Sequence, residues 1–93
     1  MNRLINVGFG NVVNSSKIVS IISPDAAPVK RMVQTAKDTG MAIDATCGRR
    51  TKAVIVTDSG HLILSSLLPD TITGRVNQHY DENQDLISNK HIQ

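Results

Sequence analysis

The sequence predicts one small α+β domain with a mainly antiparallel sheet and one principal helix. Several short runs of β-branched and other apolar residues are separated by turn residues, which is typical of strands that follow one another closely. The stretch from residue 23 to residue 40 instead repeats its apolar residues with a helical spacing. The 93 residues of the chain are the length of a single domain.

The first part of the chain predicts extended segments around a glycine-rich turn. Residues 3–7 should form a strand, and Gly8-Phe9-Gly10-Asn11 favour a tight turn because glycine and asparagine tolerate positive backbone angles. A dinucleotide-binding loop is rejected here, since the third glycine and the following helix are missing. Residues 12–13 resume an extended run. Residues 17–22 are so rich in β-branched residues that a central strand, covered on both faces, is expected.

The principal helix is predicted to start at Ser23-Pro24-Asp25. A hydroxyl can accept a hydrogen bond from a free N–H group, a proline suits the first turn, and a carboxylate is favoured by the helix dipole. Pro28 must then lie within the first turn, and Gly40 is expected to end the helix. Four apolar residues at helical spacing define one buried stripe: Val29, Met32, Val33 and Ala36.

Three further strands are predicted after the helix. Residues 41–46 and 51–57 are joined by Cys47-Gly48-Arg49-Arg50, a connection short enough for an antiparallel hairpin with the two arginines at its tip. Asp58-Ser59-Gly60 favours a second tight turn. It leads into residues 61–65, which become the third strand of a meander.

The end of the chain divides into a last helical segment and a polar tail. Residues 69–75 are predicted to form a short helix, although Gly74 disfavours it. The folded domain is assigned to residues 1–76, and residues 77–93 are expected to be a disordered tail because they have few apolar side chains to bury. The domain carries nine basic and five acidic side chains, a net charge of +4, and the tail has a net charge of −2.

The composition argues against several classes of protein. No apolar run reaches the roughly 20 residues of a membrane helix and no signal-peptide pattern is present, so a cytoplasmic protein is expected. The single Cys47 cannot form an internal disulfide and fits a reducing compartment. His61, His79 and His91 lack metal-ligand spacing, so no metal or cofactor is expected. Self-association is the expected way to stabilise so small a core.

A cluster of cations is the strongest functional signal. Three cations lie in four positions at a predicted turn, within Gly48-Arg49-Arg50-Thr51-Lys52. The planar guanidinium group of arginine can bind a phosphate in a bidentate manner, through two of its oxygens. On the helix, Lys30 and Arg31 could extend this patch together with Lys37, and Lys17 at the head of a strand is a similar candidate. The alternative is that all these charges are simply solvated. The chain has almost no aromatic residues for stacking single-stranded bases, so double-stranded DNA fits better.

A catalytic site is not expected. Cys47 and His61, together with several Asp and Ser residues, form no local motif of nucleophile and base. Cys47 is interpreted as a small residue at a bend and His61 as a side chain at a strand edge. Only their meeting in space would favour an enzyme.

Three stretches of the chain together are specific: Ile5-Asn6-Val7-Gly8-Phe9-Gly10-Asn11, Ser23-Pro24-Asp25 with Ala27-Pro28-Val29-Lys30-Arg31-Met32, and Asp44-Ala45-Thr46-Cys47-Gly48-Arg49-Arg50-Thr51. With these stretches the chain resembles the RemA family of bacterial regulators of extracellular-matrix genes. The resemblance covers roughly residues 3 to 76 and leaves the tail outside. It implies a non-enzymatic DNA-binding transcriptional activator of biofilm matrix operons. It also implies a ring-like homo-oligomer of LytTR-like modules.

Individual positions carry over from this resemblance. Arg49 and Arg50 match the family's paired arginines, whereas Lys17 stands where an arginine is expected and Cys47 where an aromatic residue is expected. The partner implied is double-stranded promoter DNA, contacted by cations repeated around the ring. The expected DNA-contacting residues are Arg49, Arg50, Lys17, Lys52, Arg31 and Lys30. The alternative is an oligomeric scaffold or protein-interaction module without direct DNA binding.

Overall fold

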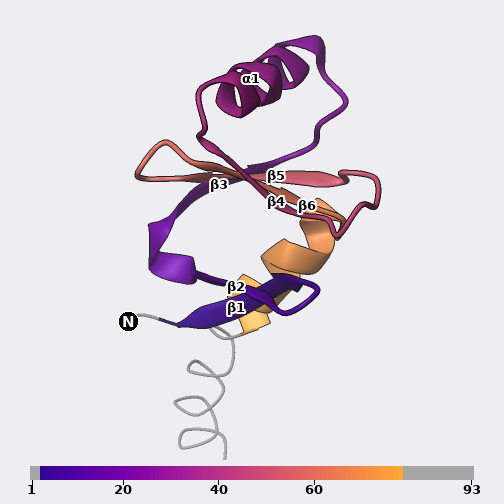
Figure 1. The fold of residues 1–93 in the computed structure, drawn as a ribbon. Helices are drawn as coiled ribbons and strands as arrows, with labels where there is room; N and C mark the ends of the chain where they lie inside the picture. Colours follow the sequence, from indigo (N-terminus) through magenta and orange to yellow (C-terminus); the bar gives the residue numbers. More distant parts are fainter. Residues whose placement is uncertain (1–2, 79–93) are drawn as a thin grey trace, which may run out of the picture.

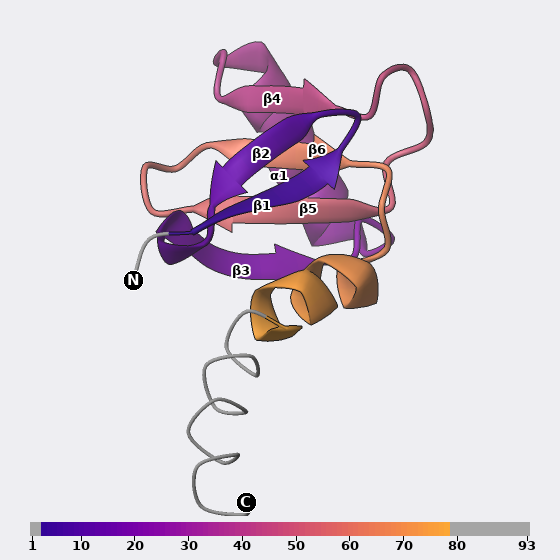
Figure 2. The same ribbon diagram turned by 90° about the horizontal axis from the view of Figure 1, so that it is seen from below.

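The computed structural model describes residues 3–78 and has three layers (Figure 1). The middle layer is a four-stranded sheet with strand order β3-β5-β6-β4. Helix α1 (Ala27–Asp38) covers one face of this sheet. The other face is covered by the hairpin of β1 (Leu4–Gly8) and β2 (Asn11–Asn14), with a second helix over residues 69–78 beside it (Figure 2). The α+β class with a mainly antiparallel arrangement is confirmed.

The sheet strands are β3 (Ile18–Ile22), β4 (Ala42–Ala45), β5 (Ala53–Thr57) and β6 (Leu62–Ser65), and a 3-10 turn at Ser15–Lys17 precedes β3. Side chains alternate between the two faces of a strand, so β5 contributes to two cores. Val54 packs under α1 with Ala36, whereas Ile55 packs on the opposite face with Val7 and Ile72.

Several local predictions are confirmed. The turn at residues 58–60 joins β5 and β6 as an antiparallel hairpin in which Ile55 pairs with Ile63. The glycine-rich turn joins β1 to β2, so no helix follows it. Pro28 lies in the first turn of α1, and Gly40 follows the C-terminal cap with a φ of 76°, in the left-handed region that glycine tolerates.

The predicted hairpin of residues 41–46 and 51–57 is wrong. β4 pairs in parallel with β6, and β5 pairs with β3 and β6. The reason is burial: β5 reads AVIVT and is buried along almost its whole length, so it takes a central position, whereas β4 contains the exposed residues Ile43 and Asp44. The arginines therefore do not lie at a hairpin tip but on a connection that crosses the end of the sheet.

The expectation that residues 17–22 form a central strand is also wrong. β3 is an outer strand of the sheet, and Val19 is 65% exposed. Its β-branched composition reflects strand propensity, which does not distinguish an edge strand from a central one.

Helix α1 starts three residues later than predicted, with Ala26 in place of Ser23 as the N-terminal cap and Ala27 as the first helical residue. The Ser23 hydroxyl donates to the Asp25 carboxylate at 3.1 Å and accepts from the Asp25 N–H at 3.4 Å. Ser23 thus closes a local turn and cannot cap the helix. Within the predicted stripe, Ala36 is buried and Val29 and Val33 are half-buried, but Met32 is 42% exposed.

The predicted last helix is present and runs through Gly74 to residue 78, where the described part of the chain ends. Ile72 is fully buried in the core, and this anchoring offsets the low helix propensity of Gly74. Residues 77–78, assigned to the tail, continue the helix, and the rest of the predicted tail lies outside the described residues. No helix within residues 3–78 is long and apolar enough to cross a membrane.

Candidate nucleic-acid interface

One end of the sheet gathers most of the predicted cations and is termed the arginine end. The connection of residues 46–52 crosses the sheet there, because β4 and β6 run in parallel and both finish at this end, where the antiparallel β5 begins. Figure 2 shows this connection beside the turn between β1 and β2. Arg49, Arg50 and Lys52 are all exposed.

A tight turn fixes the backbone of the connection. The N–H group of Arg49 donates to the carbonyl of Thr46 at 3.0 Å. The two residues between them, Cys47 and Gly48, have φ values of 53° and 79°, as in a type I′ turn. Cys47 is therefore at a bend, as expected, and its thiol is exposed and free.

Asp44 anchors the start of the same turn. Its Oδ1 atom accepts hydrogen bonds from the Thr46 hydroxyl at 2.6 Å and from the Thr46 N–H at 2.8 Å. These two bonds, with a smaller contribution from the charge of Lys37, hold the pKa of Asp44 below its usual 3.8, against a smaller opposing effect of desolvation. At neutral pH the carboxylate is charged, and it fixes the direction in which the connection leaves β4.

Arg49 lies over an aromatic ring. Its guanidinium carbon is 4.9 Å from the centroid of the Phe9 ring, within the range of a cation–π interaction. Phe9 belongs to the turn between β1 and β2, so this contact joins the hairpin layer to the arginine-bearing connection.

Arg50 borders two neighbouring hollows of about 270 Å³ each. Lys52 shares the first with Arg50, and Lys30 and Lys37 of α1 line the second. Within residues 3–78 none of these four cations forms a salt bridge, and the only carboxylate lining the hollows is that of Asp25. The arrangement offers unpaired cations from two elements, which is suited to binding phosphate groups.

Buried and partly exposed hydrogen bonds hold the hairpin against this end. The hydroxyl of the fully buried Ser65 donates to the carbonyl of Val7 at 2.6 Å and accepts from the Leu67 N–H at 3.1 Å. Arg75 of the second helix donates to the carbonyl of Asn6 at 2.6 Å. Arg75 is thus occupied with a structural contact.

The other two predicted DNA contacts lie elsewhere on the chain. Lys17 is at the opposite end of the sheet, where its ammonium group is 3.6 Å from the Asp58 carboxylate. Arg31 lies on a different side of α1 from Lys30 and lines an apolar groove. Within one copy of the chain, the arginine end therefore unites Arg49, Arg50, Lys52 and Lys30, but neither Lys17 nor Arg31.

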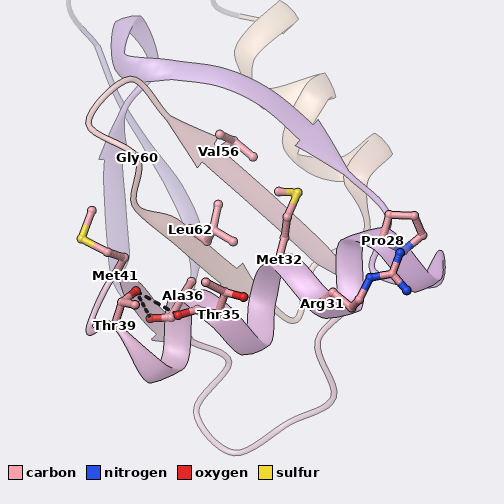
Figure 3. Close-up of a pocket in the computed structure, with 10 residues that line it drawn as sticks. All are labelled: Pro28, Arg31, Met32, Thr35, Ala36, Thr39, Met41, Val56, Gly60 and Leu62. Atoms are coloured by element: carbon pink, nitrogen blue, oxygen red, sulfur yellow. Dashed lines mark hydrogen bonds between the residues drawn. The ribbon is translucent and has the colours of Figure 1, made fainter.

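The apolar groove runs between α1 and the sheet and has a volume of about 600 Å³ (Figure 3). Pro28 and Arg31 lie at one end, Thr39 and Met41 at the other, and the Met32 side chain points into the space between helix and sheet. Met32 is thus turned toward an open groove, which explains its exposure.

Within the described residues, Cys47 and His61 do not meet in space. Cys47 is at the arginine end, whereas His61 lies at the opposite end, where its Nδ1 atom is 2.7 Å from the Ser59 hydroxyl. Among residues 3–78 no three His, Cys, Asp or Glu side chains are grouped as metal ligands would be.

Three residues of the arginine end were not among the six predicted contacts. Lys37 was considered only as an extension of the patch, and Asp25 only as a helix-start residue. Phe9 was interpreted only as part of a turn, although an aromatic residue between two glycines is an uncommon choice for such a position. This unusual residue choice is the only feature of the sequence that could have pointed to a role for Phe9.

Comparisons with known proteins agree with the resemblance. The family described as extracellular matrix regulatory protein A-like, or RemA-like, matches residues 4–76. A protein of Lachnoclostridium phytofermentans named "Putative regulatory protein" is 67% identical over 78 residues, covering 84% of this chain and 86% of its own length. Relatives with the same descriptive name from Alkaliphilus metalliredigens and Brevibacillus brevis are each 53% identical. The former match covers 98% of this chain and 97% of the relative, and the latter 89% and 96%. The chain therefore belongs to the RemA-like family of regulatory proteins.

Proposed function

We propose that this protein is a DNA-binding transcriptional activator of extracellular-matrix operons, which holds double-stranded promoter DNA through the phosphate contacts of its arginine end. The observation that carries the proposal is the set of unpaired cations around Arg50, drawn from the connection and from α1. The regulatory names of the relatives support a role in regulation, and the matrix operons come from the family description. Phosphate contacts position a protein on DNA without reading its sequence, so duplex bending is the proposed source of selectivity.

The modest charge of one domain makes assembly part of the proposal. The net charge of +4 over residues 1–76 neutralises few phosphates, and several copies would multiply it. The sheet has two unpaired edges within the described residues, one along β3 and one along β4. Each of these strands exposes an apolar side chain, Val19 on β3 and Ile43 on β4. When two different surfaces of a subunit bind each other head to tail, the subunits form a ring if their successive rotations add up to a full turn. In such a ring Lys17 and Arg31, which lie outside the arginine end, make only secondary contacts to the same DNA.

The test compares two arginines that carry the same charge. Arg50→Ala should weaken binding to a promoter fragment by at least about tenfold at about 0.1 M salt, because the lost group can make paired hydrogen bonds to phosphate. Arg31→Ala is the matched control. Its loss of DNA affinity should be smaller, because Arg31 lines the apolar groove and lies outside the arginine end. Light scattering should give wild-type particle size for both variants. Equal losses of affinity in the two variants would show that only the net charge of the protein matters. Unaltered DNA binding by Arg50→Ala would reject the arginine end as the binding site.

A scaffold that binds another protein is the second candidate, and the apolar groove beside α1 favours it. Methionine side chains such as Met32 and Met41 adapt to differently shaped partners. This alternative predicts that the protein does not bind promoter DNA directly, and that Met32→Glu abolishes regulation while leaving particle size unchanged.

A further inference from the structure

Phe9 occupies a position that is unfavourable for a phenylalanine. Its φ of 51° lies in the left-handed region, which residues with bulky side chains rarely adopt. Half of its surface is exposed, and it belongs to neither core cluster. Glycine or asparagine would hold the same turn at a lower conformational cost. The fold alone therefore does not explain an aromatic ring here.

The two segments that meet at Phe9 are both held rigidly. In the turn between β1 and β2, the Asn6 side chain accepts from the Gly8 N–H at 2.7 Å, and the Asn11 side chain donates to the Gly8 carbonyl at 2.9 Å. In the connection, the bond from the Arg49 N–H to Thr46 fixes the backbone that carries the guanidinium group. The contact of Phe9 with Arg49 is thus made between two ordered backbones.

We propose that Phe9 is a positioning residue of the DNA-binding site, whose ring holds the Arg49 guanidinium in place before DNA arrives. This inference rests on the proposed function. The guanidinium carbon lies over the ring, and within residues 3–78 the side chain of Arg49 makes no hydrogen bond or salt bridge, so its N–H donors stay available for phosphate oxygens. Immobilising a long side chain on binding costs conformational entropy, and an arginine that is already ordered loses less of it.

The central experiment uses two substitutions in the full chain. Phe9→Asn keeps a residue that accepts the left-handed conformation but removes the ring, and Phe9→Tyr keeps the ring. Phe9→Asn should unfold at or near the wild-type temperature and keep wild-type particle size, yet bind a promoter fragment about two- to fivefold more weakly per site. Phe9→Tyr should bind like the wild type. Wild-type binding by Phe9→Asn, or equal weakening by Phe9→Tyr, would overturn the proposal.

A double-substitution cycle separates positioning from a purely structural role. In an Arg49→Ala background, adding Phe9→Asn should cost no further affinity, because the guanidinium that the ring positions is gone. If Phe9→Asn weakens binding by the same factor with and without Arg49, the ring acts through the fold and the proposal is wrong. This cycle remains decisive even if Phe9→Asn lowers the unfolding temperature.

The Arg50→Ala variant keeps this proposal distinguishable from the proposed function. If Arg50→Ala binds as tightly as the wild type, the DNA-binding site itself is rejected. If Arg50→Ala loses affinity while Phe9→Asn does not, the site stands and only the positioning role of Phe9 is rejected.

Discussion

The two ends of the four-stranded sheet both carry cations, but they hold them differently. At the arginine end, Arg50 and Lys52 have no ion-pair partner among residues 3–78, and a long-range hydrogen bond from the buried Ser65 hydroxyl to the Val7 carbonyl holds the neighbouring hairpin in place. At the opposite end, Lys17 is paired with Asp58 beside a short local turn. A cation thus becomes a candidate phosphate ligand through its neighbours in space, which its own position in the sequence does not reveal.

The largest expected effect is on the free energy of unfolding. It is measured with a serine-to-alanine substitution at each end of the sheet. Ser65→Ala leaves the Val7 carbonyl and the Leu67 N–H without their partner, which should cost about 1–3 kcal/mol of unfolding free energy. Ser59→Ala removes an exposed hydroxyl and should stay within about 0.5 kcal/mol of the wild type. Urea unfolding at one fixed protein concentration measures both, because assembly contributes to stability. Equal losses of unfolding free energy in Ser65→Ala and Ser59→Ala would show that the two ends are not held together differently.

A smaller effect compares one carboxylate from each end. Asp25 lies among the arginine-end cations and would repel an approaching phosphate, so Asp25→Asn should raise the affinity for promoter DNA by about two- to fivefold at low salt. Asp58→Asn frees Lys17 from its ion pair, and the gain should be smaller because an exposed pair contributes little. Titrations of a labelled promoter DNA duplex with each variant measure the two affinities. A larger gain from Asp58→Asn would move the main DNA contact to the opposite end.

The smallest effect concerns the turn that directs Arg49. The folded-state pKa of Asp44 is depressed, so its contribution to stability is present above the unfolded pKa of 3.8 and is lost as the pH falls through the folded value. Thr46→Val removes the hydroxyl bond but keeps the N–H bond, so the pKa should rise only part of the way toward 3.8. An NMR titration of the Asp44 carboxyl carbon measures it. An unchanged pKa would show that the hydroxyl bond does not hold the turn.

The features that could be predicted from the sequence are those decided by neighbouring residues. The turn at residues 58–60, the glycine that follows α1 and the exposure of Arg49 and Arg50 all follow from local chemistry. The parallel pairing of β4 with β6 could not be predicted in this way, because it depends on which strand buries both faces.

The candidate site was only partly accessible to sequence reasoning for a similar reason. The Arg49-Arg50 pair is visible as a local cluster, but Phe9 reaches Arg49 only because the hairpin layer packs at that end of the sheet. In the same way, Lys30 and Arg31 are neighbours in the chain but lie on different sides of α1, and only Lys30 shares a hollow with Arg50. Spatial neighbours from separate elements leave no local pattern.

Coverage of the arginine end by DNA can be measured at Cys47, the chain's single cysteine, which lies exposed two residues before Arg49. The measurement is the rate at which an uncharged maleimide modifies this thiol with and without saturating promoter duplex, since an uncharged reagent is not itself attracted to DNA. A chain with Cys47→Ala and Ser59→Cys reports on the opposite end. We predict that DNA slows modification at position 47 by at least about fivefold, and by clearly less at position 59, because bound phosphates block access at the arginine end. If the rate at Cys47 stays the same while the DNA is bound, DNA does not cover the arginine end.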